Sequence, residues 1–226
     1  MTELFPEVSR GQEAYYDALA ATYDQVAMEV EWRPNDILRP FLQVHCAPVR
    51  SFLDLGAGTG QTIQTVLEYA QPERIVAVDT SQSMLDQLAQ KPFGSRITSL
   101  RSPIKDYVKG PGETFDLVVS VGVFEHIPYF DELFDPIVAR LNPGGRLAFT
   151  YEPILPEVAE QREAVYHHTV RDGNAGFFFT MFRSPEDWIM DGVQASGLTV
   201  VDAGMSAAYR IGSRVVQYGF VGGVKP

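Results

Sequence analysis

The chain has 226 residues, of which 45% are hydrophobic and 21% are charged. These values are ordinary for one globular domain of roughly 100–250 residues, and they exclude a collagenous, fibrous or largely disordered chain. The formal net charge of −11 disfavours nucleic acid and anionic membranes as partners, because an acidic surface repels polyphosphate and acidic headgroups.

Cysteine content and the first residues limit the kinds of site and location to consider. Cys46 is the only cysteine, so an intramolecular disulfide and a cysteine-based zinc site are excluded. The first ten residues lack a basic segment followed by an apolar run, and no run approaches 18 apolar residues. We therefore expect a cytoplasmic protein with no membrane association.

Strands and helices are predicted to alternate through the first two thirds of the chain. Apolar runs bounded by turn residues predict strands at 51–56, 74–79, 96–101, 115–122 and 145–152. Amphipathic spacing predicts helices at 11–30 (one helix or a pair), 34–44, 61–70, 82–90 and 131–141. Ser81 is expected to cap the helix at 82–90, and Asn-Pro-Gly-Gly at 142–145 to stop the helix before it. This alternation is typical of a doubly wound α/β fold with a mostly parallel sheet.

The last third of the chain has a different pattern. Residues 153–184 are rich in aromatic residues and histidine, and a helix is expected near 185–196. Strands at 198–203 and 214–223 have no room for a helix between them, which predicts an antiparallel pair at one sheet edge. We divide the single domain, 1–226, into an N-terminal helical cap (1–48), a cofactor-binding core (49–152), an insertion or lid (153–184) and a C-terminal part (185–226).

A glycine-rich loop follows the first predicted strand. The run Asp54-Leu-Gly56-Ala-Gly58-Thr-Gly60 allows a tight turn and close approach of a ligand. The dinucleotide fingerprint G-x-G-x-x-G needs glycine at 61, where this chain has Gln61. The carboxylate of Asp54 beside a helix start favours a ligand that carries positive charge over a pyrophosphate.

Asp79 ends the second predicted strand, 25 residues after Asp54. A carboxylate at that position can accept hydrogen bonds from the two hydroxyls of a ribose. The alternative is a cap for the helix that follows.

These motifs together resemble the class I S-adenosylmethionine-dependent methyltransferases. The resemblance rests on DLGAGTG (54–60), VAVDTSQSML (76–85), FDLVVSVGVFEHI (115–127) and LNPGGRLAF (141–149). It implies a seven-stranded sheet in the order 3-2-1-4-5-7-6 with the last strand antiparallel. It also implies S-adenosyl-L-methionine as cofactor and S-adenosyl-L-homocysteine as product.

The resemblance carries cofactor roles to particular residues. Gly56, Ala57 and Gly58 would face the methionine part, Asp79 the ribose hydroxyls, and Thr80 and Met84 the adenine. Family members often have an acid for the adenine amino group where this chain has Pro103, so adenine selection falls to Ser102, the backbone near Ile104 and packing. The full cofactor-binding set expected is Tyr23, Arg33, Asp54, Gly56, Ala57, Gly58, Gly60, Asp79, Thr80, Met84, Ser102, Pro103, Ile104 and Val121.

Three of the expected roles have a competing interpretation. Tyr23, in a Tyr-Asp pair like that of many relatives, would close over the cofactor or be a core aromatic residue. Arg33 would meet the cofactor carboxylate or form a surface salt bridge. His126 would act as a general base, or it would only pack at a helix end.

The acceptor is expected to lie between the N-terminal cap and residues 153–184. Candidate acceptor-binding residues are Tyr15, Tyr16, Tyr166, His167 and Phe178. The run GFFFTMF (176–182) is a wall of an apolar pocket or a buried strand. Adjacent His167 and His168 on one expected helix would point in different directions, so we expect no metal site.

The function expected is in-line methyl transfer from S-adenosylmethionine to a small-molecule acceptor, by a monomer or a homodimer. Two alternatives keep the same pocket: a reaction other than methyl transfer, and a non-catalytic regulatory role. An oxidoreductase with a divergent nucleotide loop is disfavoured by Asp54 and Gln61.

Overall fold

The structure, a computed structural model, describes residues 6–46, 48–172 and 175–226, without the side chains of 6–10, 167–172, 175–179 and 211. The helices are α1 (Pro6–Leu19), α2 (Tyr23–Glu29), α3 (Pro34–His45), α4 (Gln61–Leu67), α5 (Gln82–Ala89), α6 (Ile104–Lys109), α7 (Phe134–Ala139) and α8 (Glu186–Ala195). The strands are β1 (Ser51–Leu55), β2 (Arg74–Asp79), β3 (Ile97–Arg101), β4 (Phe115–Ser120), β5 (Leu141–Tyr151), β6 (Val165–Asp172), β7 (Ala175–Phe182), β8 (Thr199–Ile211) and β9 (Arg214–Val224). In the described part of the chain, no helix has the length and apolar character needed to cross a bilayer.

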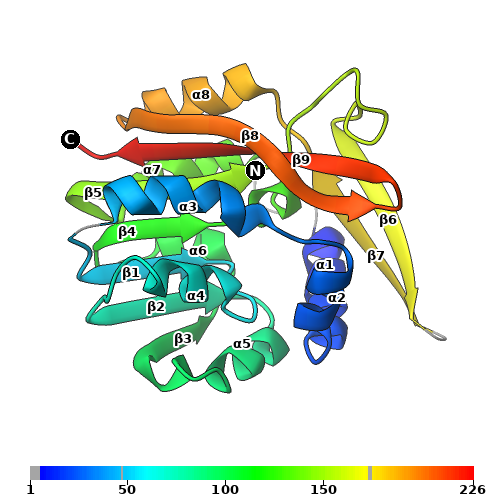
Figure 1. Ribbon diagram of the computed structural model, residues 1–226, viewed down its shortest axis with the longest axis horizontal. Coiled ribbons are helices and arrows are strands. Elements are labelled where there is room, and N and C mark those ends of the chain that lie inside the picture. The colour runs from blue at the N-terminus through cyan, green and yellow to red at the C-terminus, as the bar shows by residue number, and fades with distance from the viewer. Residues whose placement is uncertain (1–5, 47, 173–174) are drawn as a thin grey trace.

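Seven strands form one sheet in the order β3-β2-β1-β4-β5-β9-β8. Strands β1 to β5 pair in parallel, and β9 runs antiparallel to both β5 and β8. Strands β6 and β7 form a separate antiparallel hairpin, so β8 and β9 are the sixth and seventh strands of the main sheet. The expected order and the antiparallel last strand are therefore confirmed (Figure 1).

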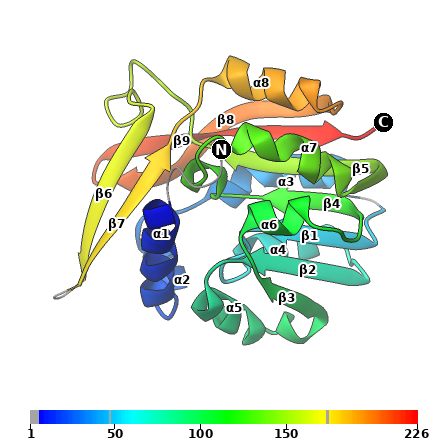
Figure 2. The same ribbon diagram turned by 180° about the vertical axis from the view of Figure 1, so that it is seen from behind.

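Helices cover both faces of the main sheet. Helices α3, α4 and α5 contribute to one buried cluster, and α6, α7 and α8 to another (Figure 2). Neighbouring residues of a strand alternate between the two clusters: Phe52 and Ile75 face the first, whereas Leu53 and Val76 face the second. Strands buried on both faces explain the nearly continuous apolar runs in the sequence.

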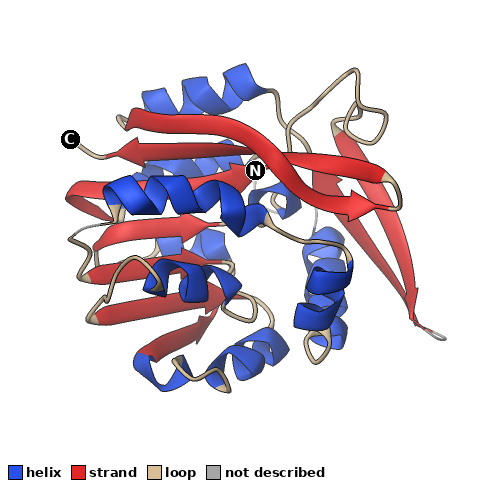
Figure 3. Cartoon of the chain, viewed as in Figure 1, coloured by secondary structure: helices blue, strands red, loops and turns tan. Residues whose placement is uncertain are grey.

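The N-terminal cap and the hairpin lie beyond the carboxyl ends of the parallel strands. Figure 3 shows α1, α2 and the β6–β7 hairpin at that end, where the extended parts of β8 and β9 also reach. Gln12 of α1 donates a hydrogen bond from Nε2 to the carbonyl oxygen of Thr180 in β7 at 2.9 Å. The cap is thus attached to the hairpin as well as to the sheet.

Several local expectations were wrong. His167 and His168 lie on strand β6, because residues 165–172 pair with residues 175–182, a partner that helical periodicity does not reveal. The helix expected from residue 131 begins as a 3-10 turn, Phe130–Leu133, and becomes α-helical only at Phe134. Asn-Pro-Gly-Gly at 142–145 belongs to β5, and β8 extends to Ile211 instead of ending at Ala203.

Asp116 ties the amino ends of three strands together. Its Oδ2 accepts hydrogen bonds from the backbone N–H of Arg50 and Ser51 at 2.9 and 3.0 Å, and its Oδ1 accepts one from Asn142 at 2.7 Å. Burial opposes ionisation, but these bonds outweigh it and lower the pKa of Asp116. The Asp116 carboxylate therefore stabilises the fold above its pKa in the unfolded chain, and this stabilisation is lost as the pH falls through its folded-state pKa.

We expect Asp116→Ala to lower the free energy of unfolding at pH 7 by about 1–3 kcal/mol, because three backbone or amide donors lose their acceptor. Urea denaturation at pH 7 and pH 3.5 measures the effect, which should shrink at the lower pH. Asp191→Ala, at an exposed position of α8, is the control and should change stability little. Equal losses in the two variants would contradict this role for Asp116.

Candidate active site

The loop between β1 and α4 turns on three glycines. Gly56, Gly58 and Gly60 have φ angles of +79°, +51° and +88°, which residues with a Cβ rarely adopt. A Cβ on Gly56 would lie 2.4 Å from Cγ2 of Val123, and a Cβ on Gly60 would lie 2.3 Å from Cδ1 of Leu88. Both the turn and the close packing against the segment after β4 and against α5 therefore require glycine.

Asp54 lies in β1, directly before this loop, and only 1% of its surface is exposed. Neither carboxylate oxygen has a hydrogen-bond partner among the described residues. Burial, reinforced by the negative charge of Asp79, holds the pKa of Asp54 well above its usual range. A buried acid without donors is costly, so this position favours a ligand group that donates hydrogen bonds or carries positive charge.

Asp79 joins the glycine loop to the start of α5. Its Oδ2 accepts a hydrogen bond from the N–H of Gly58 at 2.8 Å, and its Oδ1 accepts one from the N–H of Ser81 at 2.9 Å. The cap of α5 is Ser81, as expected, because its hydroxyl accepts a bond from the N–H of Met84 at 3.1 Å. Burial outweighs the hydrogen bonds and raises the pKa of Asp79. Each carboxylate oxygen keeps a second lone pair with which it can accept bonds from a ligand.

The residues expected near adenine occupy the ends of β2 and β3. The N–H of Ser102 donates to the carbonyl oxygen of Asp79 at 2.9 Å, which holds the two strand ends together. Met84 and Ile104 are buried, whereas Pro103 is exposed. Contact of these residues and of Thr80 with a cofactor remains a prediction.

Two aspartates attach the cap helices to this loop region. Asp24 of α2 accepts hydrogen bonds from Oγ1 of Thr59 at 2.6 Å and from Nε2 of Gln61 at 2.9 Å, and it forms an ion pair with Lys91. Asp17 of α1 accepts a hydrogen bond from Oγ of Ser81 at 2.5 Å. The cap is therefore held against the glycine loop and α5 by polar contacts.

The tyrosines of the cap face the segment after β4. The hydroxyl of Tyr16 lies 2.9 Å from Nε2 of His126, and the ring centroids of Tyr16 and Tyr23 are 6.2 Å apart. Burial raises the pKa of both tyrosines, and the negative charges of Glu125 and Asp79 add to the effect. The pKa values of both tyrosines are therefore influenced by Asp79 at the end of β2 and by Glu125 after β4.

Glu125 and His126 form the 3-10 turn η2 (Phe124–His126), and burial shifts their pKa values in opposite directions. It raises the pKa of Glu125 to about 8 and lowers that of His126 to about 4. Glu125 is 1% exposed; its Oε1 accepts a hydrogen bond from the hydroxyl of Tyr218, and its Oε2 has no partner among the described residues. The higher pKa makes the ionised carboxylate of Glu125 a stronger base than the imidazole of His126, although at neutral pH Glu125 is mostly protonated. The base role of His126 remains a prediction.

A second buried acid lies where the chain leaves β5. Glu152 is fully buried, and its Oε1 lies 3.0 Å from Nε of Arg183 in an ion pair. Burial raises the pKa of Glu152 to about 7, although the charge of Arg183 opposes that shift. Nη1 of Arg183 also donates to the carbonyl oxygen of Glu163 at 3.1 Å.

The remaining expected residues fall in several places. Val121 is buried in the same cluster as Ala57, whereas the side chain of Arg33 is exposed. Tyr15 packs edge-on against Tyr16, with ring centroids 5.2 Å apart. Tyr166 is 39% exposed and lies under the guanidinium of Arg183, 5.4 Å from ring centroid to Cζ. His167 and Phe178 are on β6 and β7, but their side chains lie outside the described part of the structure.

The sequence interpretation gave no role to several residues of this region. Glu125 and Glu152 each follow a strand at its carboxyl end, which is the position where open α/β sheets bind ligands, so this signal was available. Trp32, Tyr209 and Tyr218 come together at the site because β8 and β9 extend beyond the ends of the parallel strands. No local sequence pattern indicates this extension. No group of three or more His, Cys, Asp or Glu side chains in the described part of the chain is arranged to hold a metal ion.

We expect Asp24→Asn to loosen the cap, because the ion pair with Lys91 and the charge of the acceptor for Thr59 and Gln61 are lost. Hydrogen exchange of residues 12–30 should become roughly fivefold faster, a cost of about 1 kcal/mol for a partly exposed set of contacts. Glu29→Gln, on the exposed face of the same helix, is the control and should leave exchange unchanged. Unchanged exchange in Asp24→Asn would show that other contacts hold the cap.

Comparisons with known proteins concern the fold and the segment that holds the glycine loop. Residues 53–147 match the model of a family described as a methyltransferase domain. A trans-aconitate 2-methyltransferase of Sinorhizobium fredii is 29% identical over 128 residues, which are 53% of this chain and 48% of that protein. The chain spans about half the length of the curated relatives it matches.

Solved structures share the fold over nearly the whole chain. A complex of DhpI with SAH superposes with a TM-score of 0.70 at 17% identity, covering 97% of this chain and 98% of that one. The 1,6-didemethyltoxoflavin-N1-methyltransferase of Burkholderia thailandensis gives 0.66 at 20% identity, covering 97% and 89%. Residues 53–147, which include the glycine loop, therefore match a methyltransferase domain, and the chain as a whole has the fold of these solved structures.

Proposed function

We propose that this protein transfers a methyl group from S-adenosylmethionine to a small-molecule acceptor at the carboxyl ends of β1, β2 and β4. The observation that carries the proposal is the buried carboxyl group of Asp54 beside the glycine loop, which has no hydrogen-bond partner among the described residues. S-adenosylmethionine has both an ammonium and a sulfonium group, so its methionine end has the positive charge that this position favours.

The residues present fit such a cofactor. Asp54 and the backbone of Gly56, Ala57 and Gly58 would hold the methionine part. Asp79 would accept hydrogen bonds from the ribose hydroxyls through its remaining lone pairs. Thr80 and Met84 would lie against the adenine, with Ser102 and Ile104 at its edge.

The bound cofactor would supply a methyl group already activated on sulfur. The chain's own part is to align the acceptor, to exclude water and, where needed, to remove a proton. Tyr16 and Tyr23 would cover the reacting groups. Both lie on the cap, and both are close enough to Asp79 and Glu125 for these charges to raise their pKa values. The cap and residues 153–184 would open to admit the acceptor and close for the reaction.

Further parts of the proposal rest on the sequence expectations. These are the division of the chain at residues 48, 152 and 184, a cytoplasmic location, and action as a monomer or a homodimer without nucleic acid or membrane partners. The names of relatives favour small acceptors: trans-aconitate for one, and 1,6-didemethyltoxoflavin for another.

Two measurements test the proposal. Calorimetry should show binding of S-adenosylhomocysteine and none of NAD. Incubation with methyl-labelled S-adenosylmethionine and a metabolite extract, followed by mass spectrometry, should yield a labelled small molecule. Cofactor binding without any labelled product would favour a regulatory role, and binding of NAD alone would refute the proposal.

A further inference from the structure

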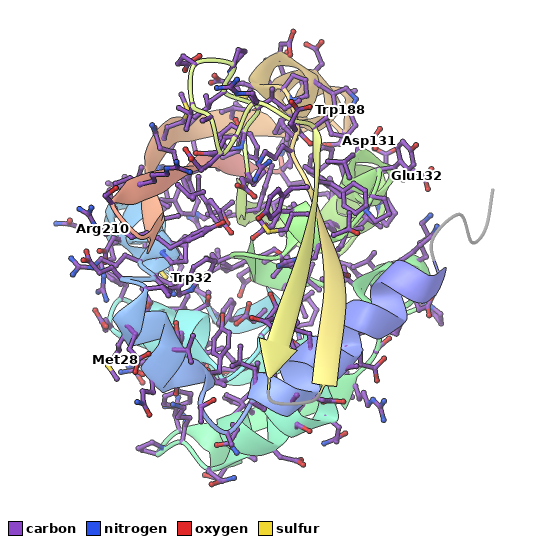
Figure 4. All side chains as sticks on the ribbon, turned by 90° about the vertical axis from the view of Figure 1, so that its right-hand side faces the viewer. Met28, Trp32, Asp131, Glu132, Trp188 and Arg210 are labelled. Atoms are coloured by element: carbon purple, nitrogen blue, oxygen red, sulfur yellow. The ribbon has the colours of Figure 1, made fainter. Side chains whose placement is uncertain are left out.

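Two buried acids and three aromatic rings gather beyond the ends of β4 and β5. We call this the acid–aromatic cluster; it comprises Trp32, Glu125, Glu152, Tyr209 and Tyr218. Figure 4 looks onto this end of the molecule and shows Trp32 between α2 and the β8–β9 strands, with α1 and the hairpin in front. The cluster therefore lies on the acceptor side of the site, where the cap, the hairpin and the sheet meet.

The three aromatic rings pack against one another, and the hydroxyl of Tyr218 donates a hydrogen bond to Oε1 of Glu125. The ring of Trp32 lies 5.6 Å from that of Tyr218 and 5.5 Å from that of Tyr209, measured between centroids. Tyr209 and Tyr218 are 6.0 Å apart and perpendicular. A Cβ built on Gly122 would lie 2.6 Å from Trp32 and 3.8 Å from Oε1 of Glu125. Trp32 and Oε1 of Glu125 thus both lie close to Gly122, the residue that follows β4 and Val121.

Glu125 keeps one hydrogen-bonding position open. Tyr218 occupies Oε1, whereas Oε2 is buried without a hydrogen-bond partner among the described residues. An unmade hydrogen bond at a buried carboxylate is unfavourable, so a ligand that donates to Oε2 gains binding energy there. Trp32 and Tyr209, in contrast, are only partly buried.

The described cations near this cluster are already engaged. Arg183 pairs with Glu152 and donates to Glu163, and Arg210, which follows Tyr209, pairs with Glu31. An anionic acceptor at Oε2 of Glu125 would therefore lie beside two acids, one of which already holds Arg183. A cationic acceptor would meet a carboxylate together with aromatic faces, which attract positive charge.

We infer that the methyl acceptor is a basic amine, which binds as a cation with its nitrogen donating a hydrogen bond to Oε2 of Glu125 and resting against Trp32. This inference rests on the proposed function, since it places the acceptor beside the cofactor position. It adds the chemical class of the acceptor and gives Glu125 the role of proton acceptor.

The proposed step balances without another reagent. The protonated amine gives one proton to Oε2 of Glu125 and becomes neutral. The nitrogen lone pair then forms a bond to the methyl carbon while the carbon–sulfur bond breaks, leaving its electron pair on sulfur and the positive charge on nitrogen. Glu125 afterwards releases its proton to solvent. The raised pKa of Glu125 is closer to that of an amine than an ordinary carboxyl would be, which favours this proton transfer.

A probe series of one shape and different charge tests the inference on protein saturated with S-adenosylhomocysteine. Calorimetry is run with benzylamine, benzyl alcohol and benzoate at pH 8.5, above the raised pKa of about 8, so that Glu125 is ionised. We expect benzylamine to bind at least about tenfold more tightly than benzyl alcohol, and benzoate to bind most weakly. Benzoate binding as tightly as benzylamine, or no binding of benzylamine, would overturn the inference.

Variants locate the effect at Glu125. Glu125→Gln should weaken benzylamine binding about tenfold or more and leave benzyl alcohol unchanged. The control Glu73→Gln, at an exposed position before β2 at the opposite end of the strands, should leave both unchanged. Equal benzylamine binding in the wild type and Glu125→Gln would also overturn the inference. Saturation with S-adenosylhomocysteine is measured first, so failure of that step counts against the proposed function, and failure of the amine series alone counts against this inference.

Discussion

Asp79→Asn is expected to weaken the binding of S-adenosylhomocysteine by about 1–3 kcal/mol, or roughly five- to 150-fold. Both oxygens of the carboxylate accept hydrogen bonds from backbone N–H groups, one from Gly58 and one from Ser81. An asparagine side chain presents a donor in place of one acceptor, so it opposes one of these N–H groups. It also removes the charge that strengthens hydrogen bonds from ribose hydroxyls.

Calorimetry with S-adenosylhomocysteine measures this effect, and urea denaturation shows how much of it is a loss of stability. Asp86→Asn is the matched control, because Asp86 is exposed on α5 near the same loop. The variant should keep a cooperative unfolding transition while losing affinity. Reduced stability with unchanged affinity would limit Asp79 to holding the glycine loop.

The stability of the protein is expected to fall by roughly 2–4 kcal/mol as the pH rises from about 5 to 8.5, because Glu125 is buried. Burial raises the pKa of Glu125 from 4.5 to about 8. Between these values the unfolded chain has lost the proton and the folded protein retains it. The folded state binds more protons in that range, so unfolding becomes easier with rising pH and the loss is complete above the folded pKa.

Glu125→Gln tests this dependence, since glutamine does not titrate. The titratable groups that interact with Glu125 are Tyr16 and Tyr23 from the cap, Glu152 after β5, and Tyr209 and Tyr218 on the last two strands; His126 is its neighbour in the chain. Of these, Glu152 also has a raised pKa, about 7, and adds to the slope in the same direction. Urea denaturation at pH 5.5, 7 and 8.5 should therefore give a smaller, but not zero, slope for Glu125→Gln. The control Glu73→Gln should keep the full slope, and identical slopes in all three proteins would contradict the raised pKa of Glu125.

The position of the cofactor core could be predicted because its signals are local. The Asp54–Gly60 loop needs glycine at positions of positive φ, and those glycines stand next to one another in the chain. Apolar runs such as residues 74–79 and 115–120 can be recognised as strands in the sequence because both faces of these strands are buried. Ser81 as the cap of α5 depends on a contact within three residues.

The structure of the lid region was predicted less well, because it depends on pairing between segments and not on local signals. Residues 165–172 form a strand only because residues 175–182 pair with them, and the hydrophobic pattern does not separate this hairpin from a helix. The length of β8 depends in the same way on β9, which supplies a partner along the whole strand. Whether such a segment forms a strand, and where the strand ends, depends on the segment with which it pairs and not on residue propensity alone.

The sheet core, the glycine loop and the acids Asp54 and Asp79 could be identified from the sequence, because each depends on residues that are neighbours in the chain. The cluster of Glu125, Glu152, Trp32, Tyr209 and Tyr218 became visible only in the folded structure. These residues come from a turn, two strands of the sheet edge and the N-terminal segment, up to 186 positions apart from Trp32 to Tyr218. Their burial together raises the pKa values of both acids, a property of the folded packing that no single segment carries.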